Sequence, residues 1–172
     1  MKGIIFVDVG KCLGCRTCEI ECAVAHSQSK NLFEAINEVP SSQPRVSVSE
    51  VEGLSVPIQC RHCEAAPCVA ICPTGAISKR GLEGPVTIDE KLCVGCRSCL
   101  AVCPYGVPQV KRGGKLVTKC DLCFERLELG QEPACVAGCP TGALQYRIIS
   151  EIGQEIRKEV LSRFTFESGT SE

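Results

Sequence analysis

Residues 93–104 read Cys-Val-Gly-Cys-Arg-Ser-Cys-Leu-Ala-Val-Cys-Pro, so that four cysteines are separated by two, two and three residues. The same spacing occurs at residues 12–22, and two further groups of four, at residues 60–72 and 120–139, have extra residues in the middle. The 16 cysteines of the 172-residue chain therefore form four quartets. Their members are Cys12, Cys15, Cys18 and Cys22; Cys60, Cys63, Cys68 and Cys72; Cys93, Cys96, Cys99 and Cys103; Cys120, Cys123, Cys135 and Cys139.

This spacing is typical of [4Fe–4S] ligation. Three cysteines two residues apart curl a loop around one cluster, and the fourth, followed by proline in the bacterial pattern, binds the neighbouring cluster. Proline follows the last cysteine of three quartets, as Pro73, Pro104 and Pro140, whereas Ala23 takes that place in the first. Zinc sites also use C-x2-C pairs, and the fourth quartet alone would fit zinc. Four quartets in one chain favour four [4Fe–4S] clusters.

The rest of the composition favours metal binding over a disulfide scaffold. With five Phe, two Tyr, one Met and no Trp, the chain has few large core residues, and small cores usually need metal or covalent cross-links. The apolar run Ile4–Val7 is too short for a signal peptide, and no apolar run approaches the roughly 18 residues of a membrane span. We therefore expect a soluble, cytoplasmic protein with reduced thiols, unless a partner carries it across a membrane.

The charge pattern gives no reason to expect binding to nucleic acid or to an anionic membrane, because the formal net charge is only −1. Basic residues do occur beside the cysteines, where they either compensate the negative charge of the clusters and tune their potentials or lie in solvent as surface charges. These residues are Lys11, Arg16, Arg61, Arg97 and Lys119.

Internal repeats indicate a duplicated ferredoxin, since Cys-Pro-Thr-Gly-Ala occurs at residues 72–76 and again at 139–143. A predicted strand pair, residues 76–78 and 85–88, lies between quartets two and three, which should therefore share a lobe. Quartets one and four then form the other lobe. Because the fourth cysteine binds the neighbouring cluster, the expected ligand sets are Cys12, Cys15, Cys18 and Cys139; Cys60, Cys63, Cys68 and Cys103; Cys93, Cys96, Cys99 and Cys72; Cys120, Cys123, Cys135 and Cys22.

The predicted fold class is α+β, with two bacterial-ferredoxin-like lobes built from small strands and short helices. The outer lobe comprises residues 1–58 plus 111–148, the inner lobe residues 59–110, and a helical tail residues 149–172. The cysteine-free segment 31–59 should contain a strand at 45–49, which either covers a cluster or docks a partner. The tail repeats apolar residues with a helical period, and we expect it to pack on its own domain rather than on a partner.

Residues of other chemical types predict no catalytic role. Because every quartet is complete, His26 and His62 should form hydrogen bonds near the clusters or at the surface rather than bind iron. The sequence has no nucleophile–base arrangement, no Gly-rich phosphate loop and no flavin signature. The expected role is electron transfer, and the alternatives are a catalytic subunit that carries clusters and a cluster-bearing redox sensor or scaffold.

Three motifs resemble those of a known family: Cys-Arg-His-Cys-Glu-Ala-Ala-Pro-Cys (60–68), Cys-Pro-Thr-Gly-Ala-Ile (72–77) and Lys-Cys-Asp-Leu-Cys (119–123). Residues 3–147 are similar to the four-cluster iron–sulfur subunits of the dimethyl sulfoxide reductase iron–sulfur family. The resemblance implies a subunit that carries electrons between a catalytic subunit and a membrane or diffusible partner. It also implies that the outer quartets pair with each other, as do the inner quartets.

Within that family, residues 22–36 most resemble the iron–sulfur protein of anaerobic carbon monoxide dehydrogenase systems. This resemblance implies a nickel–iron–sulfur catalytic partner and, as the second redox partner, a hydrogenase or a flavin-dependent NAD(P) reductase. Related subunits serve tungsten or molybdenum aldehyde and formate oxidoreductases and hydrogenases, which are the alternative partners.

Overall fold

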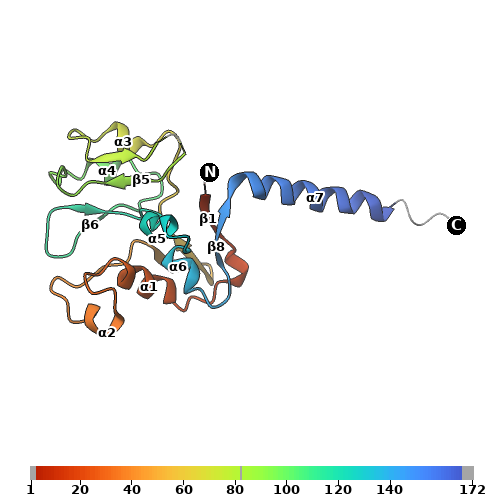
Figure 1. Cartoon of the computed structure of the whole chain (residues 1–172), viewed down its shortest axis with the longest axis horizontal. Coiled ribbons are helices and arrows are strands. Elements are labelled where there is room, and N and C mark those ends of the chain that lie inside the picture. Colours follow the sequence, from red (N-terminus) through yellow and green to blue (C-terminus); the bar gives the residue numbers. More distant parts are fainter. Residues whose placement is uncertain (1–2, 82, 168–172) are drawn as a thin grey trace.

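The computed structural model describes residues 3–81 and 83–167, the last three by their backbone alone, as short strands and helices joined by long loops (Figure 1). The helices are the 3-10 helix η1 (Val9–Lys11), α1 (Thr17–Ala25), α2 (Leu32–Ala35), α3 (Pro67–Ala70), α4 (Ser98–Ala101), α5 (Phe124–Glu128), α6 (Ala134–Ala137) and α7 (Ile149–Glu167). The strands are β1 (Gly3–Val7), β2 (Ser47–Val51), β3 (Leu54–Ile58), β4 (Ile77–Lys79), β5 (Val86–Ile88), β6 (Gln109–Val110), β7 (Val117–Thr118) and β8 (Leu144–Ile148). The expected mixture of small strands and short helices is confirmed.

One strand pair joins the two ends of the cysteine-containing region. Strand β1 pairs antiparallel with β8, in a register that places Gly3 opposite Ile148 and Val7 opposite Leu144. The β1 residues precede the first quartet, and the β8 residues follow the fourth. The pairing therefore brings the first and last quartets to the same part of the molecule.

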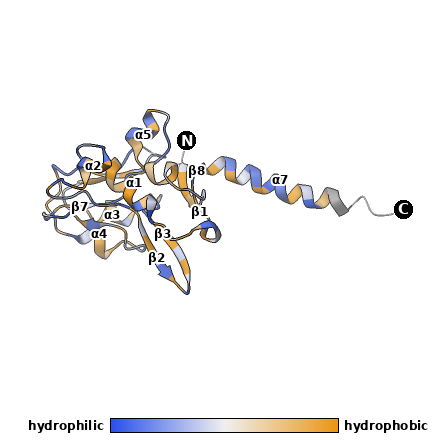
Figure 2. Ribbon diagram, turned by 90° about the horizontal axis from the view of Figure 1, so that it is seen from below, coloured by the Kyte–Doolittle hydropathy of each residue, from blue (hydrophilic) through white to orange (hydrophobic). Residues whose placement is uncertain are grey.

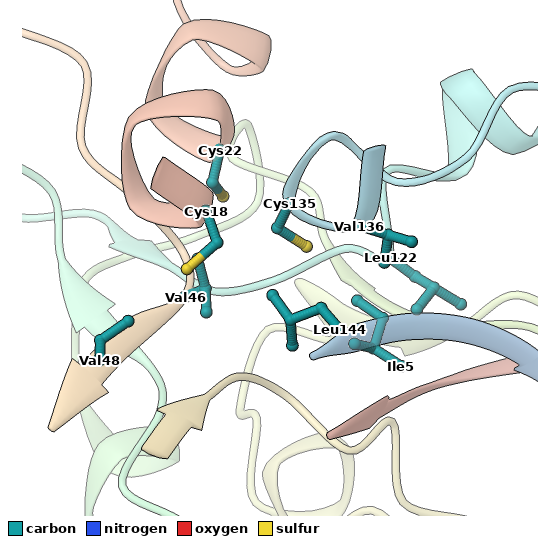
Figure 3. Close-up of a cluster of buried hydrophobic side chains, with 9 residues drawn as sticks. All are labelled: Ile5, Cys18, Cys22, Val46, Val48, Leu122, Cys135, Val136 and Leu144. Carbon is teal, nitrogen blue, oxygen red and sulfur yellow. The ribbon is translucent and has the colours of Figure 1, made fainter. Parts of the chain in front are cut away.

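Two separate groups of buried residues form the core. In the first, side chains from β1, α1, β2, α6 and β8 meet, as Figure 3 shows; its members are Ile5, Cys18, Cys22, Val46, Val48, Leu122, Cys135, Val136 and Leu144. The second contains Ile77, Val86, Cys99 and Val117. The first group comes from the segments around quartets one and four, and the second from the segments around quartets two and three, although Val117 lies beyond the predicted boundary at residue 110.

Three local hairpins complete the body. Strand β4 pairs with β5, which confirms the predicted strand pair to within one residue. Strands β2 and β3 form a hairpin in the cysteine-free segment. Val48 of β2 and Val46, which precedes this strand, pack in the same core as Cys18 and Cys22. This packing favours a covering role for the segment. Strands β6 and β7 form the shortest hairpin, with two residues in each strand.

The C-terminal helix departs from the sequence-based expectation. Helix α7 forms as predicted, but it extends away from the body, so the expectation that it packs on its own domain is wrong (Figure 1). Both hydrophobic and hydrophilic residues occur along its length in Figure 2, and Ile156 and Phe164 are 55% and 66% exposed. Helical periodicity predicted the helix but does not specify the surface that its apolar side contacts.

Candidate metal centres

All sixteen cysteines carry free thiols, and their accessibility varies widely. Cys15 and Cys96, the second cysteines of quartets one and three, are exposed. Six are buried: Cys18, Cys22, Cys99, Cys120, Cys123 and Cys135. The chain thus presents thiols both in its interior and at its surface.

Two similar cavities lie in the part of the molecule formed by quartets two and three. One is lined by four cysteines that we name the Cys60 group: Cys60, Cys63, Cys68 and Cys103. The other is lined by the Cys93 group: Cys93, Cys96, Cys99 and Cys72. In each cavity, three cysteines of one quartet face the last cysteine of the other.

Thiols of quartets one and four also interact with one another. Burial raises the pKa of Cys120, Cys123 and Cys135, and the nearby thiol of Cys22 raises each of them further. We name these four residues the Cys120 group. Helix α1, which carries Cys22, packs against α6, which carries Cys135.

The remaining cysteine of quartet four lies close to the first quartet. Burial raises the pKa of Cys18 to about 11, and the Cys139 thiol contributes to that increase. Cys139 also interacts with Cys15, whose pKa is lowered by hydrogen bonds from Thr17. Cys12 lies at the end of η1. With Cys12 added from the ligand set expected from the sequence, we name Cys12, Cys15, Cys18 and Cys139 the Cys12 group.

Left-handed backbone conformations shape the cysteine loops. In quartets one and three, the residues on either side of the second cysteine have positive φ angles: 68° at Gly14 and 59° at Arg16, and 69° at Gly95 and 65° at Arg97. Glycine adopts these angles without strain. At Gly95 the space is restricted as well, because an added Cβ atom would lie 2.6 Å from the carbonyl oxygen of Lys115. These turns make the chain reverse direction around the cysteines.

Backbone N–H groups point at several sulfurs. The amides of His62 and Leu122 each lie 3.4 Å from the sulfur of the cysteine two residues earlier, Cys60 and Cys120 respectively. The Arg45 amide donates to the Cys22 sulfur over 3.2 Å. Such donors stabilise negative charge on sulfur and are one of the means by which proteins set cluster potentials.

The repeated Cys-Pro-Thr-Gly-Ala motif has the same local geometry in both copies. The threonine hydroxyl lies 3.8 Å from the cysteine sulfur in each, between Thr74 and Cys72 and between Thr141 and Cys139. Although burial opposes it, backbone and threonine hydrogen bonds lower the pKa of both cysteines. Equivalent sequence thus produces an equivalent environment for the last cysteines of quartets two and four.

A charged network that the sequence did not predict lies beside the Cys120 group. Asp121 accepts hydrogen bonds from Arg45 over 2.5 Å and from His26 over 3.1 Å, and all three side chains are less than one-fifth exposed. Although burial opposes both shifts, these bonds hold the Asp121 pKa well below its usual range, and the bonds to Asp121 and Cys22 raise the pKa of His26 to about 9. Arg45 is far from the cysteines in sequence, so spacing alone does not reveal it.

Both histidines form hydrogen bonds near cysteines, as predicted. The Nδ1 atom of His26 lies 2.7 Å from the Cys22 carbonyl oxygen. His62 accepts a hydrogen bond from the Val86 amide at Nδ1 over 3.0 Å. Burial and the charge of Lys119 lower the pKa of His62 to about 3, so His62 is neutral at physiological pH.

The donor set fits iron–sulfur clusters. Each group offers four thiols, two of the groups surround a cavity, and amide donors point at sulfurs in two. Burial raises the pKa of Cys123 to about 11, so this thiol is protonated until a metal displaces the proton. Among the described residues, no helix is both long and apolar enough to cross a membrane.

Comparisons with known proteins agree with this donor set. A family model described as a 4Fe-4S dicluster domain matches residues 51–148. An iron-sulfur protein of Rhodospirillum rubrum is 42% identical over 156 residues, which cover 83% of this chain and 80% of that protein. The B subunit of the anaerobic dimethyl sulfoxide reductase of Escherichia coli K12 is 36% identical over 152 residues (86% and 74% covered). The electron transport protein HydN of the same strain is 37% identical over 159 residues (84% and 87% covered).

Proposed function

Because the chain belongs to the 4Fe-4S dicluster domain family, we propose that it is the electron-transfer subunit of an oxidoreductase complex and holds four [4Fe–4S] clusters. The observation that carries the proposal is the convergence of Cys60, Cys63, Cys68 and Cys103 on one cavity and of Cys72, Cys93, Cys96 and Cys99 on another. A bound [4Fe–4S] cluster supplies a reversible one-electron site whose potential depends on charge, burial and hydrogen bonds to sulfur.

The four named cysteine groups are the proposed ligand sets. In these sets, quartets two and three exchange their last cysteines, and so do quartets one and four. The two cavities and the electrostatic interactions between the outer thiols support this exchange. We accordingly propose two ferredoxin-like lobes, the outer from residues 1–58 and 111–148 and the inner from residues 59–110. The two separate cores support two lobes, although Val117 packs in the core of the inner one and lies beyond the boundary at residue 110.

We further propose that the four groups form a series, which electrostatic interactions between their thiols support. The Cys18 thiol of the Cys12 group raises the pKa of Cys135 in the Cys120 group, where burial is the main cause. Cys60 acts on Cys120 in the same way, and Cys68 acts on Cys99 of the Cys93 group. The proposed order begins with the Cys12 group, continues with the Cys120 group and the Cys60 group, and ends with the Cys93 group. The exposed thiols Cys15 and Cys96 belong to the first and last of these groups. A chain so arranged accepts electrons at one end and delivers them at the other.

As the catalytic partner we propose a nickel carbon monoxide dehydrogenase, with a hydrogenase or a flavin NAD(P) reductase as the second partner. The support is the resemblance of residues 22–36. The proposed location of the complex is cytoplasmic, where thiols stay reduced and available to iron.

A second candidate is the electron-transfer subunit of a molybdenum or tungsten oxidoreductase, such as an aldehyde or formate oxidoreductase. The 36% identity to the B subunit of anaerobic dimethyl sulfoxide reductase favours it.

The test is anaerobic purification of the tagged chain from its own host, followed by metal analysis and mass spectrometry of the co-purifying subunits. Nickel together with a carbon monoxide dehydrogenase subunit, and bleaching of the clusters by CO, are the expected results. Molybdenum or tungsten with a pterin-binding subunit would replace the first candidate by the second. A purified chain without iron would refute cluster binding itself.

A further inference from the structure

A buried lysine lies beside two of the cysteine groups. Lys119 is 3% exposed, and its Nζ atom donates hydrogen bonds to the carbonyl oxygens of Val86 and, over 2.9 Å, of Cys120. The same atom lies 3.7 Å from the Cys60 sulfur. An ammonium group has three N–H donors and no acceptor, and here three acceptors surround it. The three acceptors therefore match the three donors of the Lys119 ammonium group.

Lys119 contacts the Cys60 group and the Cys120 group in different ways. Its side chain lines the cavity of the Cys60 group, where its charge also acts to lower the pKa of Cys68 against the raising effect of burial. With the Cys120 group, Lys119 forms a hydrogen bond to the backbone carbonyl of Cys120. Among the described residues, it forms no hydrogen bond to a sulfur of that group. The positive charge is thus directed at the sulfurs of the Cys60 group.

Lys119 differs from the other basic residues that flank cysteines. The side chains of Lys11 and Arg16 are 54% and 63% exposed and pair with the nearby carboxylates of Asp8 and Glu19. Arg61 and Arg97 are exposed as well. Water and salt screen exposed charges, whereas a buried charge acts through a medium of lower dielectric constant. Among these five residues, Lys119 has the strongest electrostatic effect on a neighbouring thiolate.

A second contact holds the lysine in place. The carbonyl of Val86 accepts from Lys119, and the amide of Val86 donates to Nδ1 of His62. His62 itself lies in the loop between Cys60 and Cys63. Strand β5 therefore links the lysine to the loop of the Cys60 group, and the ammonium cannot turn toward solvent without leaving buried carbonyl groups unpaired.

We propose that Lys119 is a positioning residue that raises the reduction potential of the cluster held by the Cys60 group above the value that its cysteines alone would give. The inference rests on the proposed function, because it requires that cluster. Reduction adds one negative charge, and a fixed buried cation beside the sulfurs stabilises the reduced form more than the oxidised form. The cluster of the Cys60 group is thereby reduced more easily than it would be without the Lys119 charge.

The test is a redox titration of the full-length protein, purified anaerobically and followed by electron paramagnetic resonance. The variants are Lys119→Met, which removes the charge at similar size, and Lys119→Gln, which keeps a donor without the charge. Lys119→Arg retains the charge. The matched control is Lys158→Met, which removes an equal charge from an exposed position on α7. The signal of the Cys60 group is identified as the one missing from Cys103→Ala.

We expect reduction of that one cluster to become about tenfold less favourable in both uncharged variants, which corresponds to about 59 mV for a one-electron couple. The arginine variant and the Lys158→Met control should titrate like the wild type. An uncharged variant with full iron content and unchanged potentials would overturn the inference, and so would an equal shift of every cluster. Loss of iron from both uncharged variants would assign Lys119 a structural role instead. A wild-type chain that binds fewer clusters would refute the proposed function, a separate result.

Discussion

Replacing Cys103 by alanine should remove the cluster of the second quartet, although Cys103 is the last cysteine of the third. Cys103 lines the same cavity as Cys60, Cys63 and Cys68. Four [4Fe–4S] clusters amount to about 16 iron atoms per chain, so the loss of one leaves about 12. The same number is expected for Cys63→Ala, because both substitutions remove a ligand from one group.

Double variants distinguish this grouping from a sequential one. The Cys63→Ala, Cys103→Ala variant should keep about 12 iron atoms, because both positions belong to the Cys60 group. The Cys63→Ala, Cys96→Ala variant should keep only about 8, because Cys96 lines the other cavity. If each quartet bound its own cluster, the Cys63→Ala, Cys103→Ala variant would instead lose two clusters, and the Cys96→Ala, Cys103→Ala variant would lose only one.

The assay is iron and acid-labile sulfide analysis of anaerobically reconstituted protein, with the spins of the fully reduced clusters counted by electron paramagnetic resonance. Circular dichroism of each variant shows whether the fold is retained. About 8 iron atoms in Cys63→Ala, Cys103→Ala, with about 12 in Cys96→Ala, Cys103→Ala, would refute the exchange of last cysteines.

Three further predictions concern the fold around the groups. In each, the measured quantity is the midpoint temperature at which the absorbance of the clusters is lost on heating. Gly95→Ala should lower this midpoint by several degrees more than the control Gly106→Ala. Both positions have positive φ, but only at Gly95 would the new Cβ atom meet a backbone oxygen, that of Lys115. Equal effects of the two substitutions would contradict this reasoning. Asp121→Ala should lower the free energy of unfolding by about 3 kcal/mol, and with it the midpoint, because it leaves the largely buried Arg45 without its partner. An unchanged midpoint would show that water replaces the carboxylate. Deleting all residues from 149 onward should leave iron content and midpoint unchanged, because α7 extends away from the body; loss of iron would mean that the helix supports the clusters.

The features predicted from sequence are those that local chemistry determines. Cysteine spacing identified the four quartets, and the turn between the second and third predicted the β4–β5 pair that the structure contains. Apolar periodicity likewise predicted helix α7, because a helix is a local structure. The copies of Cys-Pro-Thr-Gly-Ala have matching threonine–sulfur distances of 3.8 Å, as expected from equal sequence.

The features that sequence could not predict depend on contacts between distant segments. Arg45 and Asp121 are 76 residues apart, and no spacing rule connects a loop arginine to an aspartate between two cysteines. Lys119 was one of five basic residues beside cysteines, and only burial separates it from the other four. The direction of α7 was predicted wrongly because an amphipathic period is compatible with packing on the chain itself or with none.

The absence of a proline after Cys22 explains another contact between distant segments, that between His26 and Asp121. Where a proline follows the last cysteine, the preceding residue is kept from helical conformation, and α3, α4 and α6 are each only four residues long. Ala23 permits α1 to continue past Cys22 to Ala25, nine residues in all. This extra turn places His26 where its ring meets both the Cys22 carbonyl and Asp121. The departure from the proline pattern in the first quartet therefore allows the charged network beside the Cys120 group to form.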